Sequence, residues 1–179
     1  MKANQLLVSI SALALCCGGV LYGQVSPATT ETASAGGKTI SIKYGAPSVR
    51  GRQIFGDGGK LSSDPTYPAW RGGADNATAF HTDSDLTIGN LSVPKGDYTL
   101  YVWVKDPNAW ELIVNKQTGQ WGTVYDASKD LGRVKMNMST PGAPVEKLKY
   151  TLSGIYTGNG KLEIAWEKHV ASVPVKVTK

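Results

Sequence analysis

Arginine is segregated in this chain: three of its four arginines bracket one glycine-rich region. Arg50 and Arg52 come before that region, and Arg71 follows Trp70 at its far end. A guanidinium group is a planar fork that binds a carboxylate or a phosphate bidentately, whereas lysine offers only a point charge. We therefore expect Arg50, Arg52 and Arg71 to form a pocket for an anionic group, together with Trp70 and Asp75.

A purely structural role is the alternative for the same arginines. One or two of them could pair with Asp57, Asp64 or Asp75 and so fix the loop, because buried or half-buried arginine usually has a carboxylate partner. Such pairing is the more common role for an arginine in a loop of this kind, and both interpretations are carried forward.

A second group that could carry chemistry is His81 with Asp83 and Asp85. These side chains would share one face if a single strand ran through them. They could then ligate a metal ion or act as a base and its orienting group. A turn at Asp83–Ser84 is favoured instead, since both residue types favour turns. A hydrolase that uses His81 with Asp83 or Asp75, and an arginine as oxyanion stabiliser, remains the alternative function.

No other catalytic or metal-binding signature stands out. The chain has no Gly-x-Ser-x-Gly elbow, no phosphate-binding loop and no His-Glu-x-x-His. The second histidine, His169, has only Glu167 beside it and is expected at the surface. We expect neither a cofactor nor a bound metal.

The stretch Leu91–Val104 predicts the fold most clearly. Alternate side chains from Tyr98 onward point to opposite faces of a strand. The preceding Pro94-Lys-Gly-Asp has the composition of a turn. The spacing resembles a tyrosine corner, in which the tyrosine hydroxyl bonds to backbone upstream. We expect Tyr98 to be buried, with its hydroxyl bound to the segment Asn90–Pro94.

Tyr101 and Trp103 lie on the other face of the same strand. An exposed aromatic pair on a sheet could hold a sugar ring. The alternative is that the long loop covers this face with Trp70 and Phe55, and it is favoured because large aromatic residues dominate protein cores.

Short alternating segments with frequent turn signals continue to the end of the chain, and no helical periodicity is sustained. This pattern is typical of an all-β, antiparallel β-sandwich or jelly roll with a long glycine-rich loop near its N-terminus. We expect one domain over residues 38–179, preceded by a flexible spacer at 24–37. Pro174 lies within the last alternating segment and predicts an edge strand there.

Residues 1–23 have the features of a secretory signal peptide. Lys2 is followed by the apolar run Leu6–Leu15 and then by small residues. Cleavage near Gly23 would give a secreted or periplasmic protein without a transmembrane segment, because a run of about ten apolar residues is too short to span a bilayer.

Both cysteines, Cys16 and Cys17, fall in this signal segment. Lipidation at Cys16 is less favoured, because Leu15 precedes it where a small residue is required. A chain cleaved near Gly23 would have no cysteine, which excludes disulfides, a thiolate nucleophile and Cys–zinc ligation.

The formal net charge of +5 comes from dispersed residues. Lysines occur singly along the expected strands, as Lys147 and Lys149 do on either side of Leu148. No run of basic residues indicates nucleic-acid binding.

Several segments together resemble the domain of unknown function 2911 family of secreted bacterial proteins. They are Tyr44–Gly56, Trp70–Ala74, Asp97–Leu100, Asn115–Gly122 and Ala165–Val175. The resemblance spans Thr39 to Val177. This sequence has Gly72 and Asp75 where the family usually has threonine and asparagine. The resemblance implies one secreted domain and no particular activity.

The sequence thus predicts a non-catalytic binding module for a glycan or an anionic small ligand, with its site at the arginine-bearing loop. Function usually lies on loops that a rigid scaffold holds in place. A structural protein that binds partners through exposed strand edges is a third interpretation.

Overall fold

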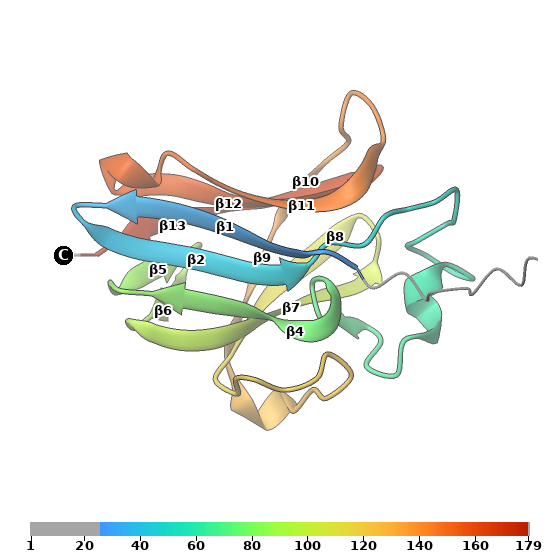
Figure 1. The fold of residues 1–179 in the computed structure, drawn as a ribbon, viewed down its shortest axis with the longest axis horizontal. Helices are drawn as coiled ribbons and strands as arrows, with labels where there is room; N and C mark the ends of the chain where they lie inside the picture. Colours follow the sequence, from blue (N-terminus) through green and yellow to red (C-terminus); the bar gives the residue numbers. More distant parts are fainter. Residues whose placement is uncertain (1–25, 179) are drawn as a thin grey trace, which may run out of the picture.

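Two antiparallel β-sheets, of seven and six strands, pack face to face in the computed structural model, which describes residues 26–178 (Figure 1). The predicted all-β sandwich is confirmed. The helical elements of the described chain are three short 3-10 turns, η1 (Lys60–Ser63), η2 (Ala127–Lys129) and η3 (Ile155–Thr157). None of the helices at residues 26–178 has the length and apolar character needed to cross a bilayer.

The first sheet contains most of the N-terminal half. Its strand order is β1 (Ala28–Ala35), β2 (Lys38–Gly45), β4 (Ala74–Thr82), β7 (Gly96–Asp106), β8 (Ala109–Asn115) and β9 (Asp130–Lys135), and β3 (Ala69–Trp70) also pairs with β7.

The second sheet combines the C-terminal strands with one early hairpin. Its order is β11 (Val145–Ser153), β12 (Asn159–Glu167), β13 (His169–Val177), β5 (Leu86–Ile88) and β6 (Leu91–Val93), and β10 (Asn137–Ser139) also pairs with β13. After β4 the chain therefore crosses to the second sheet, forms the β5–β6 hairpin there, and returns to the first sheet at β7.

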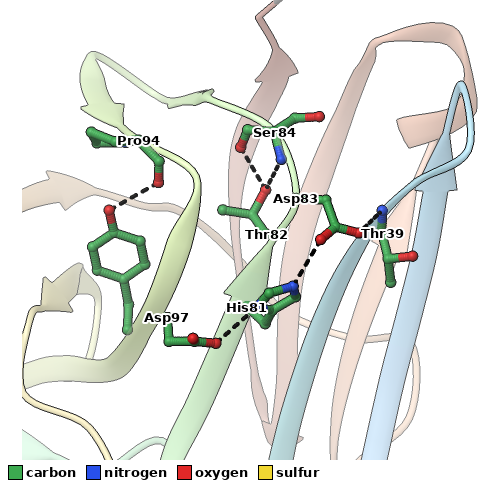
Figure 2. Close-up of polar contacts among 8 residues, drawn as sticks. Thr39, His81, Thr82, Asp83, Ser84, Pro94 and Asp97 are labelled. Atoms are coloured by element: carbon green, nitrogen blue, oxygen red, sulfur yellow. Dashed lines mark hydrogen bonds and ion pairs between the residues drawn. The ribbon is translucent and has the colours of Figure 1, made fainter.

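Alternation along β7 builds the core as the sequence predicted. Leu100, Val102 and Val104 are buried between the sheets. Tyr98 is also buried, and its hydroxyl donates a hydrogen bond of 2.9 Å to the Pro94 carbonyl (Figure 2). The tyrosine corner is therefore present, and it fixes the link between β6 and β7.

The expected flexible spacer is wrong for most of its length. Residues 28–35 form β1, which pairs with β2 from Ala28↔Gly45 to Ala35↔Lys38. The small, polar residues gave no sign of a strand, although their side chains alternate between exposed and half-buried positions. Gly36 and Gly37, both at positive φ, make the turn between the two strands. The predicted signal peptide lies outside the described residues.

The edge strand expected from Pro174 is also wrong, because β13 lies inside the second sheet. On one side β13 pairs with β12 along its length. On the other side β10 pairs with residues 170–172 and β5 with residues 175–177. Pro174 falls in the gap between those two short partners, where the ladder is already interrupted, so its missing N–H is tolerated.

The outer face of the first sheet is covered, but by a segment other than the one expected. Tyr101 is fully buried there, and its hydroxyl donates to the Val124 carbonyl at 2.6 Å. Its ring packs on Tyr125 with centroids 4.8 Å apart. The covering segment is residues 116–129, between β8 and β9, whereas Trp70 and Phe55 belong to the main core.

Candidate functional site

The long segment between β2 and β3 projects from one end of the sandwich (teal in Figure 1) and encloses a cavity of about 400 Å³. All five residues predicted for a ligand site line this cavity: Arg50, Arg52, Trp70, Arg71 and Asp75. The structure therefore brings together residues that are up to 25 positions apart in the sequence.

Four further lining residues matter to the chemistry of the cavity, and the sequence did not single them out as site residues. They are Ser48, Lys60, Asp64 and Trp166. Trp166 comes from β12, more than 90 residues beyond the others, and only the packing of the two sheets places it here.

Backbone hydrogen bonds to β11 hold the first part of the loop. The Val49 N–H donates to the Glu146 carbonyl at 2.8 Å, and the Arg50 N–H donates to the Glu146 carboxylate at 2.9 Å. Arg50 and Gly51 both have positive φ, so the chain reverses immediately after this attachment.

Arg52 stabilises that reversal with part of its guanidinium. Its Nε donates to the Val49 carbonyl at 2.9 Å, and its Nη2 donates to the Ser48 carbonyl at 2.6 Å. A guanidinium has five N–H donors, so this side chain can hold the turn and still offer donors to a ligand.

Arg71 is paired internally, as the structural alternative proposed. Its Nη2 forms a short ion pair with the Asp64 carboxylate, and its Nη1 donates to the Asp75 carbonyl at 3.3 Å. Burial alone would raise the pKa of Asp64. Hydrogen bonds from Thr66 and the charge and hydrogen bond of Arg71 outweigh that effect and hold the pKa below its ordinary value.

Two tryptophans line the inner wall of the cavity. The Trp70 and Trp166 rings stack with centroids 5.5 Å apart and planes 20° apart. The Trp70 indole N–H donates to the Gly73 carbonyl at 3.1 Å, whereas the buried Trp166 indole N–H has no acceptor within residues 26–178. The wall is therefore rigid and carries one donor that no described protein group satisfies.

Asp75 lies where the cavity meets a second hollow of about 370 Å³. Its φ of 65° is a left-handed conformation, which aspartate tolerates better than most residues. Its carbonyl accepts from both Arg71 and the Gly122 N–H. Asp75 therefore anchors the covering segment to the cavity through its backbone.

His81 lies elsewhere, on β4, between two carboxylates (Figure 2). Its Nδ1 is 2.7 Å from Asp97 Oδ1, and its Nε2 is 3.1 Å from Asp83 Oδ1. The second Asp83 oxygen accepts from the Thr39 N–H at 2.9 Å. Hydrogen bonds to Asp97 and then Asp83 raise the pKa of His81, so the charged imidazolium is favoured.

Of the alternative catalytic group, Asp83 contacts His81, whereas Asp85 and Asp75 lie elsewhere. The strand ends at Thr82 and a bend follows, as the turn interpretation predicted. Asp85 instead accepts a hydrogen bond of 2.8 Å from the Lys95 N–H. Asp97 was missed, because only the pairing His81↔Asp97 between β4 and β7 brings it close. No group of three or more His, Cys, Asp or Glu among residues 26–178 could hold a metal ion.

His169 is not the surface residue that was expected. Its side chain is 19% exposed, and its ring stacks on Trp110 with centroids 5.5 Å apart. Burial lowers the pKa of His169 and outweighs the opposing effect of Glu167.

Comparison with known proteins gives a family and no activity. The family model described as "Protein of unknown function (DUF2911)" matches residues 26–175. No curated protein and no solved structure matches the chain. The matched range includes every residue that lines the cavity.

Proposed function

The chain belongs to the DUF2911 family of proteins of unknown function, as its motifs predicted, and we propose that it is a secreted or periplasmic, non-catalytic binding protein for an acidic ligand. The ligand is a glycan acid or an anionic small molecule. It binds in the cavity between the β2–β3 loop and the end of the sandwich.

The charge of the cavity wall is the observation that carries this proposal. Four cationic residues line the cavity, Arg50, Arg52, Arg71 and Lys60, against the two acidic residues Asp64 and Asp75. Arg71 and Asp64 pair with each other and cancel, which leaves three cationic residues against Asp75. A concave site with an excess of one charge concentrates ligands of the opposite charge.

The size and rigidity of the cavity fit a small ligand. Its volume of about 400 Å³ is in the range of small-molecule sites. Stacked Trp70 and Trp166 form one wall, and the Arg71–Asp64 pair fixes the loop that forms the other. A site that is ordered before binding loses less conformational entropy when the ligand arrives.

The geometry at His81 gives less support to a hydrolase. A general base needs a free lone pair directed at the proton it removes. Both ring nitrogens of His81 face carboxylate oxygens instead, and the raised pKa favours the charged form. The arrangement fits a structural network of polar contacts that links β4 to β7 and to the start of β2.

Isothermal titration calorimetry tests the proposal with D-glucuronate, oligogalacturonate, citrate and phosphate, and with D-glucose as the neutral control. We expect saturable binding of at least one acid and none of D-glucose. Lys60→Glu should weaken that binding about tenfold or more, because it places a like charge in the cavity wall.

Lys149→Glu is the matched control, since it makes the same charge change at an exposed position on β11 outside the cavity. It should leave the affinity within about twofold of the parent protein. Failure of all four acids to bind, or equal weakening by both substitutions, would refute the proposed site.

A further inference from the structure

A third hollow, also of about 370 Å³, is separate from the one beside Asp75 and shares no lining residue with the arginine cavity. His169 and Met138 both line it, together with Pro107, Asn108, Ser139, Thr140 and Lys168. An imidazole and a thioether are the two donors of this set that suit a soft metal ion.

The two nitrogens of His169 lie in different surroundings. Nδ1 is buried and 3.5 Å from the Glu167 carboxylate. Nε2 makes no hydrogen bond to residues 26–178. Unlike Nδ1, it is not a buried atom without a partner, so Nε2 is accessible to solvent. Nδ1 makes no hydrogen bond, but the carboxylate charge 3.5 Å away favours the proton on Nδ1, and a proton there leaves the lone pair on Nε2. In metal-binding histidines, the ring nitrogen that does not bind the metal commonly faces a carboxylate.

Glu167 holds that carboxylate in place at some cost to the backbone. It is the last residue of β12, and with Lys168 it makes the tight reversal enclosed by the pair Trp166↔His169. Its φ of 55° is unusual for glutamate and costs about 1 kcal/mol. The other carboxylate oxygen accepts from the Ile54 N–H at 3.3 Å. The Glu167 carboxylate therefore connects the β2–β3 loop, through Ile54, to His169.

Strand register places the thioether on the same side as the imidazole. Met138 in β10 pairs with Ala171 in β13, and His169 is two residues before Ala171. Residues two apart along a strand share a face, and diagonal neighbours across an antiparallel pair are within reach of long side chains. Met138 is half-buried against the core, so its thioether is held beside the hollow.

We propose that this hollow binds Cu(I) through His169 Nε2 and the Met138 thioether. Thioether and neutral imidazole together select this soft ion over harder divalent cations. The stacked Trp110 ring shields one face of the imidazole. Lys168 is exposed on a flexible stem, so its ammonium group can extend into water away from the ion.

The test uses the full chain with Cys16→Ser and Cys17→Ser, because thiolates would bind Cu(I) themselves. Cu(I) is supplied as its bicinchoninate complex, whose colour reports the copper that the protein removes. We expect the protein to remove a single copper ion per chain. Met138→Leu and His169→Gln should each lower the affinity about tenfold or more.

Met136→Leu is the matched control, because Met136 is buried in the core and lines a neighbouring hollow instead. It should bind copper as the parent does. A second measurement does not depend on variants: Ag(I) should shift the ¹⁵N resonance of His169 Nε2 strongly and leave both His81 nitrogens unchanged. No copper removal by the parent, unchanged affinity in Met138→Leu, or equal loss in Met136→Leu would overturn the assignment.

Discussion

The guanidinium of Arg71 and the carboxylate of Asp64 form an ion pair that joins the β2–β3 loop to the connection between β3 and β4. Both side chains are only 12% exposed. The same carboxylate also accepts hydrogen bonds from the Thr66 N–H and hydroxyl at 3.0 and 2.8 Å. One arginine therefore lines the cavity and also fixes the loop that encloses it.

Arg71→Ala should destabilise the protein by about 2–4 kcal/mol, because removal of one partner leaves a largely buried carboxylate without its counter-charge. Thermal and urea unfolding measure the loss. Lys161→Ala is the control, since its pair with Glu163 is on the surface and should contribute under about 1 kcal/mol. If the two variants lose equal stability, the Arg71–Asp64 pair does not hold the loop.

Tyr98→Phe should cost about 1 kcal/mol, because the Pro94 carbonyl loses its hydrogen bond from the tyrosine hydroxyl. Tyr156→Phe removes the same atom from a side chain that is 79% exposed, and should leave stability unchanged. Urea unfolding of both variants gives the comparison. Equal stabilities would show that the tyrosine corner contributes nothing here.

The two histidines should titrate on opposite sides of the ordinary histidine pKa of 6.5. Hydrogen bonds to Asp97 and Asp83 raise the pKa of His81, whereas burial lowers the pKa of His169. A proton NMR titration resolves both, since the chain has only two histidines. Asp97→Asn should lower the pKa of His81 and leave the pKa of His169 unchanged.

The raised pKa of His81 also makes a small part of the stability depend on pH. Because the folded pKa exceeds the unfolded one, this stabilisation is fully present below pH 6.5 and is lost as pH rises through the folded pKa. Its size should be about 0.5 kcal/mol or less, since the side chain is 42% exposed. Unfolding of the parent and Asp97→Asn at several pH values measures it, and a difference that grows with pH would contradict this sign.

Gly72→Ala should destabilise the protein more than Gly58→Ala. Both glycines have positive φ, so both substitutions strain the backbone by about 1 kcal/mol. At Gly58 the added carbon meets open space, but at Gly72 it would lie 2.3 Å from the Tyr150 hydroxyl. That hydroxyl donates to the Gly72 carbonyl and joins the two sheets. Equal unfolding free energies would mean that this contact relaxes freely.

Local patterns in the sequence predicted the features that depend on neighbouring residues. Alternation in β7 and the turn before Tyr98 act over a few residues, and both are confirmed. The turn after His81 is a local property too. The strand β1 was missed because it has no large apolar residue to show an alternating pattern, and its pairing with β2 is not visible in the sequence.

Features that depend on register or on the packing of distant strands could not be read from the sequence. Asp97 reaches His81 only through the pairing of β4 with β7. Trp166 reaches the cavity because β12 lies opposite the first sheet. Segregation of the arginines did predict which loop forms the cavity, but which of them pairs with Asp64 depended on the folded path of the loop.

The most direct measurement of the central claim is to locate a bound acid by the five tryptophan indole N–H resonances of the protein. The titrant is the acid from the calorimetric panel that binds most tightly. Trp70 and Trp166 line the cavity, and their signals should shift together and saturate, while that of the exposed Trp121 stays in place. A saturable shift at Trp121 with no change at Trp70 and Trp166 would contradict the arginine cavity as the binding site.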